Sequence, residues 1–545
     1  MNPGAARRGL PRALDWIACA LLAASLAACG KRADPPDPAA VAASAAAASR
    51  AEADMLAARE LHVLASSEVR DIEPALQKAA AAAGVTLKLS YAGTLDIVER
   101  VNGGEAVDAL LPANGAYPNL ALTRKPLAQD KLFYSRVALG VKQAKANALG
   151  WDQQTPSWAE IARAAGAGQL RYAMTNPTSS NTGMSALFAV ASAAAGKTED
   201  LKAEEVDAKL LTAFLSGQKL SSGSSGWLAE AFIKDPSALD GMVNYEAVIL
   251  RSNEKLAPAD RLRLIYPKDG VISADYPLML VEPAKREPYN ALVAAIKGAV
   301  VQNAVASEAF LRPSLPEVAL AAGLSSAAVA ELSFPNRLEV IDAVLSAYQG
   351  EWRRPATSIF VLDISGSMAG ERIAAMRGAL KFLAGNGGTG ASARYASFQR
   401  RERVVLIAFS ELVEDPVEID FETQSLDAGR ARVTAYADAL HVKGGTGIYA
   451  ALLRAEAIAA QERLRDSERY LSIVLLTDGE NTAGPDLAGF RSTLANGAPA
   501  RVFPILFGES NSAEMDRLAS FTGGRAFDGR KAALAQVFKE IRGYQ

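Results

Sequence analysis

A short apolar run that ends in a loop of oxygen-bearing side chains constrains this chain more than any other feature. Residues 358–362 have the length and apolar composition of a buried strand, and Asp363, Ser365 and Ser367 follow at alternate positions. Gly366 permits the tight bend that brings the three side chains together. Hard oxygen ligands of this kind suit Mg²⁺ or Ca²⁺. A serine-rich turn that caps a helix is the alternative interpretation of the same residues.

Two later segments add oxygen donors of the same kind. Thr446 lies in a glycine-rich segment that precedes an apolar helical stretch at 448–460. Asp478 follows a second apolar run, 471–476, which predicts another buried strand. Both residues are therefore expected in loops, and Asp478 stands after its strand as Asp363 does.

Strands and helices alternate from about residue 356 to the C-terminus, with a further strand expected at 502–507. This alternation predicts an α/β fold with a doubly wound parallel sheet. In such sheets, the carboxyl ends of the strands and the loops beyond them form the binding crevice. The sequence thus places the candidate metal ligands at one edge of one sheet.

Residues 355–545 resemble a von Willebrand factor type A (VWA) domain, which has a Rossmann-like fold. The resemblance implies a metal-ion-dependent adhesion site, which in this family uses a D-x-S-x-S loop, a threonine and a second aspartate. The matching positions here are Asp363, Ser365, Ser367, Thr446 and Asp478. By this resemblance the site holds Mg²⁺, or another divalent cation such as Ca²⁺ or Mn²⁺, and leaves one position for an acidic side chain of a partner protein. Two carboxylates leave the ion enough positive charge to attract that side chain.

The N-terminus resembles a bacterial lipoprotein signal. Basic residues precede an apolar run at 16–28, which is too short to span a membrane comfortably. The segment 26–29 resembles a lipobox, so residues 1–29 are expected to form a signal peptide that ends at the lipidated Cys29. Acyl chains on Cys29 would hold the protein at a membrane of the bacterial cell envelope, facing the periplasm or the exterior. An ordinary secretory signal with a chance cysteine is the alternative.

Composition excludes several classes of site. The chain has two cysteines, Cys19 and Cys29, which leaves none for a disulfide, a thiolate metal site or a cysteine nucleophile. A net charge of −2 gives no reason to expect nucleic acid as a partner. Residues 30–57 are rich in alanine and proline and predict a tether that lifts the folded part from the membrane.

Repeated strand–helix units fill residues 58–345. This segment resembles a bacterial extracellular solute-binding protein of the two-lobed, periplasmic-binding-protein-like type. The resemblance places the second lobe at about 137–261 and the chain crossovers near 133–141 and 264–277. In this family the lobes close about such hinges onto a ligand.

Hydroxyl and amide side chains recur where these strands lead into helices. By position in the resemblance, the cleft would be lined by Ser66, Ser67, Thr94 and Asn114 from the first lobe and by Ser179, Ser180 and Thr182 from the second. Several hydroxyls and no positioned arginine suit an oxyanion or a neutral polar solute. The alternative is that these residues only cap helices.

The sequence offers no catalytic machinery beyond the candidate metal loop. Of its two histidines, His62 is expected to be hydrogen-bonded within a strand, and His441 to lie at a helix end or on the surface. No G-x-S-x-G elbow, Walker loop or H-E-x-x-H pattern occurs. A hydrolase that used the Asp363 metal would need a general base that the sequence does not reveal.

These features together predict two binding modules and no enzyme. A connector at 346–354, which overlaps a helical stretch around 338–349, would join the two-lobed segment to the VWA-like segment. The expected molecule is a lipid-anchored envelope protein that binds a small polar or anionic solute and a protein partner. A solute receptor for an ABC-type transporter is one alternative. An assembly or chaperone factor for an envelope complex is the other.

Overall fold

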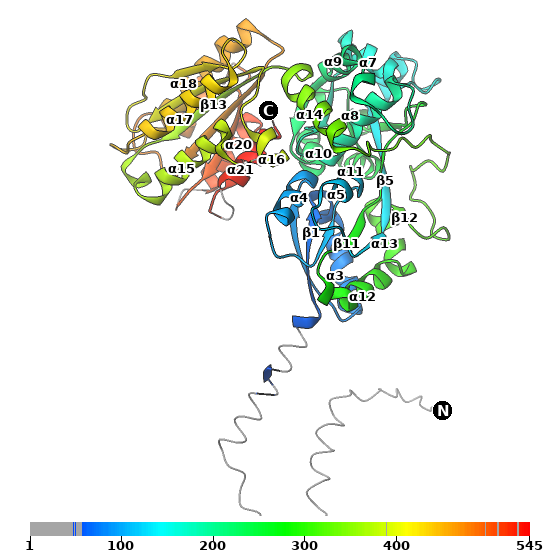
Figure 1. The fold of residues 1–545 in the computed structure, drawn as a ribbon. Helices are drawn as coiled ribbons and strands as arrows, with labels where there is room; N and C mark the ends of the chain where they lie inside the picture. Colours follow the sequence, from blue (N-terminus) through cyan, green and yellow to red (C-terminus); the bar gives the residue numbers. More distant parts are fainter. Residues whose placement is uncertain are drawn as a thin grey trace, which may run out of the picture. The chain divides into compact units, whose positions relative to one another are not determined.

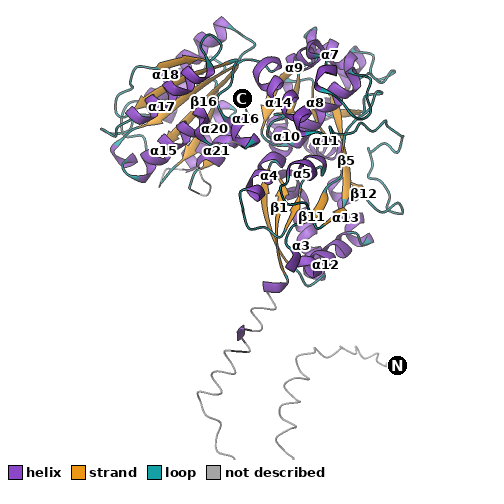
Figure 2. Cartoon of the chain, in the orientation of Figure 1, coloured by secondary structure: helices purple, strands orange, loops and turns teal. Residues whose placement is uncertain are grey.

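Three β-sheets organise the part of the chain that the structure, a computed structural model, describes (Figure 1, Figure 2). The described residues are 47, 49–50, 57–388, 390–495, 497–508, 512–530 and 534–544. The predicted signal peptide with Cys29, and most of the predicted tether at 30–57, lie outside them. Within the described residues, no helix is long and apolar enough to span a bilayer.

The first sheet, in the order β2-β1-β3-β11-β4, forms the centre of lobe one. Its strands are β1 (Glu60–Ser66), β2 (Thr86–Ala92), β3 (Ala109–Leu111), β4 (Ala128–Lys131) and β11 (Pro277–Leu280). The helices of this lobe are η1 (Ser67–Ile72), α3 (Glu73–Ala82), α4 (Thr94–Asn102), α5 (Ala116–Ala121), η5 (Pro283–Lys285), α12 (Arg286–Ile296) and α13 (Ala299–Ala309). Because β1 pairs in parallel with β2 and β3, the loops that follow these strands meet at one edge.

The second sheet forms the centre of lobe two, in the order β10-β5-β8-β6-β7 with β9 and β12 also paired to β5. Its strands are β5 (Phe133–Lys142), β6 (Tyr172–Thr175), β7 (Gln218–Ser222), β8 (Gly241–Tyr245), β9 (Leu262–Ile265), β10 (Ser273–Ala274) and β12 (Arg312–Pro313). Its helices are α6 (Gln143–Ala148), α7 (Trp158–Gly166), α8 (Asn181–Ala194), η2 (Ala203–Glu205), α9 (Ala208–Ser216), α10 (Ser225–Lys234), η3 (Pro236–Ala238), α11 (Glu246–Lys255) and η4 (Pro258–Asp260). The chain enters the lobe between β4 and β5 and returns between β10 and β11, beside the predicted crossovers.

Local sequence determines where the lobe-two helices begin and which of them is central. Ser157 and Glu160 form a capping box at the start of α7, in which each side chain accepts the backbone N–H of the other. The stretch Asn181–Ser192 of α8 is buried throughout, so this helix packs inside the lobe rather than on its surface.

A helical connector leads to the third sheet. It consists of α14 (Leu338–Ala347) and a π-helical turn, η6 (Tyr348–Trp352). The sheet has the order β15-β14-β13-β16-β17-β18, with β13 (Ala356–Asp363), β14 (Glu402–Phe409), β15 (Val417–Asp420), β16 (Tyr470–Thr477), β17 (Arg501–Leu506) and β18 (Phe527–Asp528). Its helices are η7 (Gly366–Met368), α15 (Glu371–Lys381), η8 (Phe382–Asn386), α16 (Ala391–Ala396), α17 (Leu426–Ala439), α18 (Ile448–Arg465), α19 (Leu487–Thr493), α20 (Ser512–Thr522) and α21 (Leu534–Arg542).

Helices cover both faces of this third sheet (Figure 2), as the predicted doubly wound fold requires. The side chains of Phe360 and Leu362 pack in one apolar cluster, and those of Ile359 and Val361 pack in the other. This alternation follows from the period of two along a strand, so the fully buried β13 contributes to two cores. Neighbouring strands are parallel except for the antiparallel edge strand β15.

Candidate functional site

The five predicted metal ligands lie at the carboxyl edge of the third sheet. Asp363 is the last residue of β13, and Asp478 follows the last residue of β16. These two strands are parallel neighbours, so the two carboxylates emerge side by side. Ser365 and Ser367 occupy the turn after β13, and Thr446 lies in the loop before α18. The strand order of the sheet is what brings these separate segments together.

Hydrogen bonds tie four of the five side chains into one cluster. Asp363 Oδ1 accepts the backbone N–H of Ser365 at 2.8 Å, and Asp363 Oδ2 accepts the hydroxyl of Thr477 at 2.6 Å. The hydroxyl oxygens of Ser365 and Ser367 are 3.1 Å apart. Ser367 Oγ donates to Asp478 Oδ1 at 2.7 Å. The oxygen atoms that the metal-site prediction requires are therefore within reach of one another.

Thr446 approaches the same point from the other loop. The N–H of Gly366 donates to the carbonyl oxygen of Gly444 at 3.1 Å and so joins the two loops. A Cβ built on Gly479 would lie 3.6 Å from Thr446 Oγ1 and 3.7 Å from Ser367 Oγ. Both hydroxyls thus lie beside the backbone that carries Asp478.

The charges of the cluster are partly balanced within the protein. Burial raises the pKa of the Asp363 carboxyl above its ordinary value, although the hydrogen bonds from Ser365 and Thr477 act in the opposite direction. Arg372 forms an ion pair with Asp478 and donates to the carbonyl oxygen of Ser367 at 3.1 Å.

Among the described residues, no group of three or more His, Cys, Asp or Glu side chains is arranged to hold a metal. The donor set of two carboxylates and three hydroxyls nevertheless fits a hard divalent cation that retains open positions.

A second candidate site is a cavity of about 240 Å³ at the junction of lobe one, lobe two and the VWA-like domain. Lobe one contributes Ser67, Arg70, Tyr91, Ala92, Gly93, Leu95 and Asp96. Lobe two contributes Asn176, Thr178, Ser179, Gly223, Ser224 and Trp227. The third domain contributes Ser392, Tyr395, Ala396, Arg525, Gln536, Lys539, Glu540, Arg542 and Gly543. Beside the cavity the lobes are in contact, because a Cβ on Gly93 would lie 2.2 Å from the carbonyl oxygen of Ser179.

Two of the seven predicted solute-binding residues, Ser67 and Ser179, line this cavity. Asn114 instead bonds to backbone groups of Ala116 and Ser273, and Thr182 bonds to the hydroxyl of Ser225. The remaining three side chains are buried away from the cavity lining: Ser66, Thr94 and Ser180.

The expectation of a cleft without a positioned arginine is wrong, because Arg70 and Arg525 both line the cavity. Arg70 follows the predicted Ser67 by one helical turn in η1, so its spacing from Ser67 was a signal that sequence reasoning missed. Arg525 belongs to the C-terminal domain, and nothing in the local sequence connects it with the lobes.

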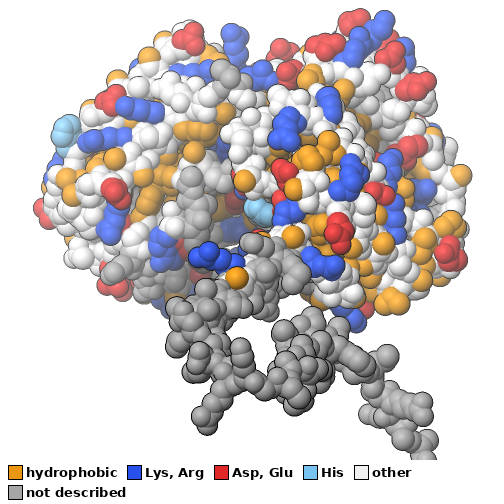
Figure 3. All heavy atoms as spheres, turned by 60° about the horizontal axis from the view of Figure 1, so that its bottom comes forward, with side chains coloured by type: hydrophobic (Ala, Val, Ile, Leu, Met, Phe, Trp, Pro, Cys, Tyr) orange, Lys and Arg blue, Asp and Glu red, His pale blue; other side chains and the backbone are white. Residues whose placement is uncertain are grey.

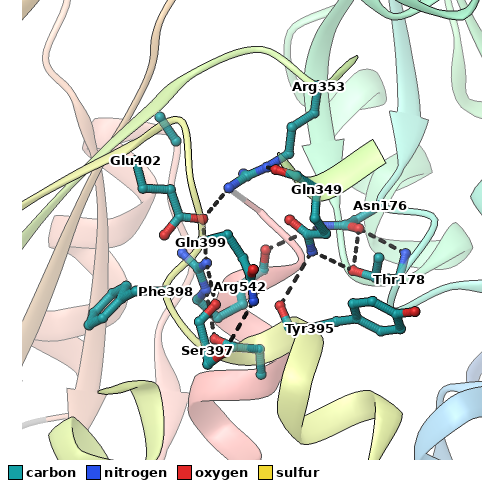
Figure 4. A network of polar contacts seen from close by, with 12 residues as sticks. Asn176, Thr178, Gln349, Arg353, Tyr395, Ser397, Phe398, Gln399, Glu402 and Arg542 are labelled. Carbon is teal, nitrogen blue, oxygen red and sulfur yellow. Dashed lines mark hydrogen bonds and ion pairs between the residues drawn. The ribbon is translucent and has the colours of Figure 1, made fainter. Parts of the chain in front are cut away.

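A buried polar network fixes the C-terminal domain against the lobes (Figure 4). Glu402, at the start of β14, forms ion pairs with both Arg353 of the connector and Arg542 of α21. The carbonyl oxygen of Arg542 accepts a hydrogen bond from Asn176 Nδ2 of lobe two at 3.4 Å. Gln349 Nε2 donates to Thr178 Oγ1 at 3.0 Å. The connector and α21 therefore meet lobe two through the same cluster.

Among the described residues, the two histidines and the charged side chains on the face shown in Figure 3 indicate no further site. Basic and acidic side chains of the described residues are interspersed on the face shown in Figure 3. His62 lies in β1, with its ring nitrogens 3.1 Å from the Ala106 carbonyl oxygen and 3.2 Å from Ser90 Oγ. His441 is exposed just after α17. Both positions agree with the sequence-based expectation.

Family comparisons divide the chain in the same way as the sheets. Residues 61–311 match the family model of the bacterial extracellular solute-binding proteins, and residues 358–480 match that of the von Willebrand factor type A domain. An uncharacterized protein of Mycobacterium tuberculosis is 34% identical over 151 residues, which are 28% of this chain and 22% of that protein. An inter-alpha-trypsin inhibitor heavy chain from Sus scrofa is 33% identical over 133 residues, which are 24% of this chain and 13% of that protein. The chain thus spans less than a quarter of either relative.

Solved structures with a similar fold include the apo ferric ion-binding protein A of Pasteurella haemolytica and the periplasmic binding protein AfuA of Actinobacillus pleuropneumoniae. The first has 13% identity and a TM-score of 0.40, and covers 53% of this chain and 96% of its own. The second has 10% identity and a TM-score of 0.41, and covers 53% and 97%. On the two family models, a segment similar to the bacterial extracellular solute-binding proteins is followed along this chain by a segment similar to the VWA domain.

Proposed function

We propose that this chain is an envelope lipoprotein that binds a small solute in its lobes and engages a protein partner through a divalent metal on its VWA domain. The observation that carries the proposal is the convergence of two carboxylates and three hydroxyls at one sheet edge. The extracellular solute-binding domain supports an envelope location. The lipobox-like segment that ends at Cys29 supports a lipid anchor there.

The residues that would hold Mg²⁺, or Ca²⁺ or Mn²⁺ in its place, are Asp363, Ser365, Ser367, Thr446 and Asp478. Such an ion would attract a carboxylate of the partner, because only two of its five protein ligands carry negative charge. Gly366 and Ser367 are exposed, so a partner can reach this side of the cluster. Arg372 forms an ion pair with Asp478 and would give it up where a metal took that carboxylate as a ligand.

The proposal is tested by affinity capture from solubilised cell envelopes with the full chain as bait, in Mg²⁺ and in EDTA. Asp363→Asn removes a charged ligand at nearly constant volume, and Ser367→Ala removes an exposed hydroxyl ligand. Ser492→Ala changes an exposed serine of α19 and serves as the matched control. We expect a partner that the wild type and Ser492→Ala retain in Mg²⁺, and that EDTA and both ligand variants release. A partner retained equally in EDTA would contradict metal-dependent binding.

The solute-binding domain favours a second candidate, a receptor that delivers its solute to an ABC-type transporter. In that case the captured protein would be a membrane permease. Its retention would depend on the solute and would be unchanged in EDTA and in Asp363→Asn. The same experiment therefore separates the two functions.

A further inference from the structure

Two guanidinium groups in the cavity between the lobes and the VWA domain form no close ion pair among the described residues. Arg70 of η1 lies over the ring of Tyr91, with Cζ 4.6 Å from the ring centroid. Arg525 lies over the ring of Trp227 at 3.6 Å. Neither arginine forms an ion pair with another residue that the structure describes, although Arg525 donates to the hydroxyl of Tyr544 at 3.5 Å. A guanidinium stacked on a ring keeps its N–H edges free to bind an anion in its own plane.

The other basic groups of the cavity already form ion pairs with acidic residues. Lys539 of α21 forms ion pairs with Asp96 at 3.0 Å and with Glu99 at 3.2 Å. Arg542 is paired with the buried Glu402 at 2.5 Å. Among the charged residues that line the cavity, this leaves Arg70 and Arg525 facing the single carboxylate of Glu540, so an anionic ligand brings the cavity closer to neutrality.

The VWA domain closes the cavity on its third side. Lys539 binds acidic residues of α4 in lobe one, whereas Ser221 Oγ of lobe two donates to the carbonyl oxygen of Gly543 at 2.9 Å. Gly223 and Gly543 pack so closely that a Cβ on Gly543 would lie 2.3 Å from the Cα of Gly223. One short segment, α21 and the residues after it, therefore contacts both lobes.

We propose that this cavity binds a small oxyanion, a carboxylate or a phosphate-like ion, between Arg70 of lobe one and Arg525 of the VWA domain. The VWA domain is then part of the solute site rather than a separate module. The inference rests on the solute binding proposed above and specifies its ligand class and its third wall. The aromatic faces of Tyr91 and Trp227 hold the two guanidinium groups in place, and the hydroxyls of Ser67 and Ser179 lie in the same lining.

The test is isothermal titration of the full chain with sodium phosphate, sulfate, acetate and benzoate at constant ionic strength. We expect saturable binding of at least one anion to the wild type. Arg70→Gln and Arg525→Gln should each weaken that binding by about tenfold or more, because each removes charge-assisted hydrogen bonds to the anion. Arg491→Gln is the matched control, since Arg491 of α19 is stacked on Phe521 at 5.0 Å but does not line the cavity.

The outcomes separate this inference from the proposed function. Failure of all four anions to bind the wild type would overturn the inference. If Arg525→Gln binds an anion as tightly as the wild type while Arg70→Gln does not, the site belongs to the lobes alone. Solute binding then stands and the shared site does not. Circular dichroism melting curves that match the wild type show that each variant is folded. Metal-dependent capture is scored separately and does not depend on Arg525.

Discussion

Replacing Glu402 by glutamine removes the charge that holds two buried guanidinium groups together. The Glu402 side chain is fully buried, and the side chains of Arg353 and Arg542 are 4% and 5% exposed. Glutamine keeps an acceptor oxygen but leaves two positive charges close together without a counter-ion. Breaking a buried ion pair in this way typically costs about 3–5 kcal/mol. We therefore expect Glu402→Gln to destabilise the VWA domain by that amount at neutral pH.

The measurement is thermal unfolding of the full chain followed by circular dichroism. For domains of about 150–250 residues, each kcal/mol lowers Tm by about 2–4 °C, so the transition should fall by about 6–20 °C. Glu418→Gln is the control. Glu418 pairs with Arg403 at 3.0 Å, but its side chain is 49% exposed, and such surface pairs contribute about 0–1 kcal/mol. Equal shifts in the two variants would refute the assignment of stability to the buried triad.

The contribution of Glu402 also has a defined pH dependence. Burial alone would raise the pKa of this carboxyl, but Arg542 and Arg353 outweigh burial and hold the pKa below the ordinary value of 4.5. A carboxyl whose pKa is lower in the folded state adds stability above its unfolded pKa and loses it as the pH falls through the folded pKa. The difference in Tm between wild type and Glu402→Gln should be full above about pH 4.5 and shrink in more acidic solution.

Three further substitutions test other parts of the structure. Arg372→Gln frees the Asp478 carboxylate and should raise the affinity for Mg²⁺ about two- to fivefold, measured by calorimetric titration. Burial raises the pKa of Glu456 to about 7, so its ionisation destabilises the fold as the pH rises from about 4.5 through 7. Glu456→Gln should therefore be more stable than wild type by about 1–3 kcal/mol in urea unfolding at pH 8 and indistinguishable from it at pH 4. Gly543→Ala places a Cβ 2.3 Å from a lobe-two Cα and should detach α21, which small-angle scattering would show as a larger radius of gyration. Gly226→Ala is the control, because its Cβ has no neighbour within 4 Å and should leave the radius of gyration unchanged.

The position of the two metal-cluster aspartates at strand ends was predictable, because it depends on local rules. Asp363 and Asp478 each follow a continuous apolar run, and parallel strands present such residues at the same edge. That the two strands are also neighbours depends on the strand order of the sheet, which the alternation of strands and helices along the chain does not determine. The ion pair of Arg372 was not predictable, because it depends on the side-chain direction at the start of α15. Occupancy of the site by a metal stays a prediction.

The solute site was much less predictable, because a hydroxyl after a strand has two equally good uses. Ser67 and Ser179 line the cavity, whereas the side chains of Asn114 and Thr182 form hydrogen bonds within their own lobes. Which use prevails depends on how the lobes close, and no local pattern encodes that. The presence of Arg525 in the cavity lining was not predictable from the sequence, because it depends on how the whole C-terminal domain packs against the lobes.

The docked position of α21 makes lobe closure and VWA placement a single equilibrium. Opening the cleft would separate Asp96 from Ser221, and the segment from Lys539 to Gly543 is bonded to both of them. The lobes therefore cannot part without releasing the VWA domain from at least one of them. A ligand that binds the closed cavity stabilises the docked domain by its difference in affinity between the closed and open states. By thermodynamic reciprocity, a partner that prefers the docked VWA domain must tighten solute binding by the same factor, and one that prefers the released domain must weaken it equally.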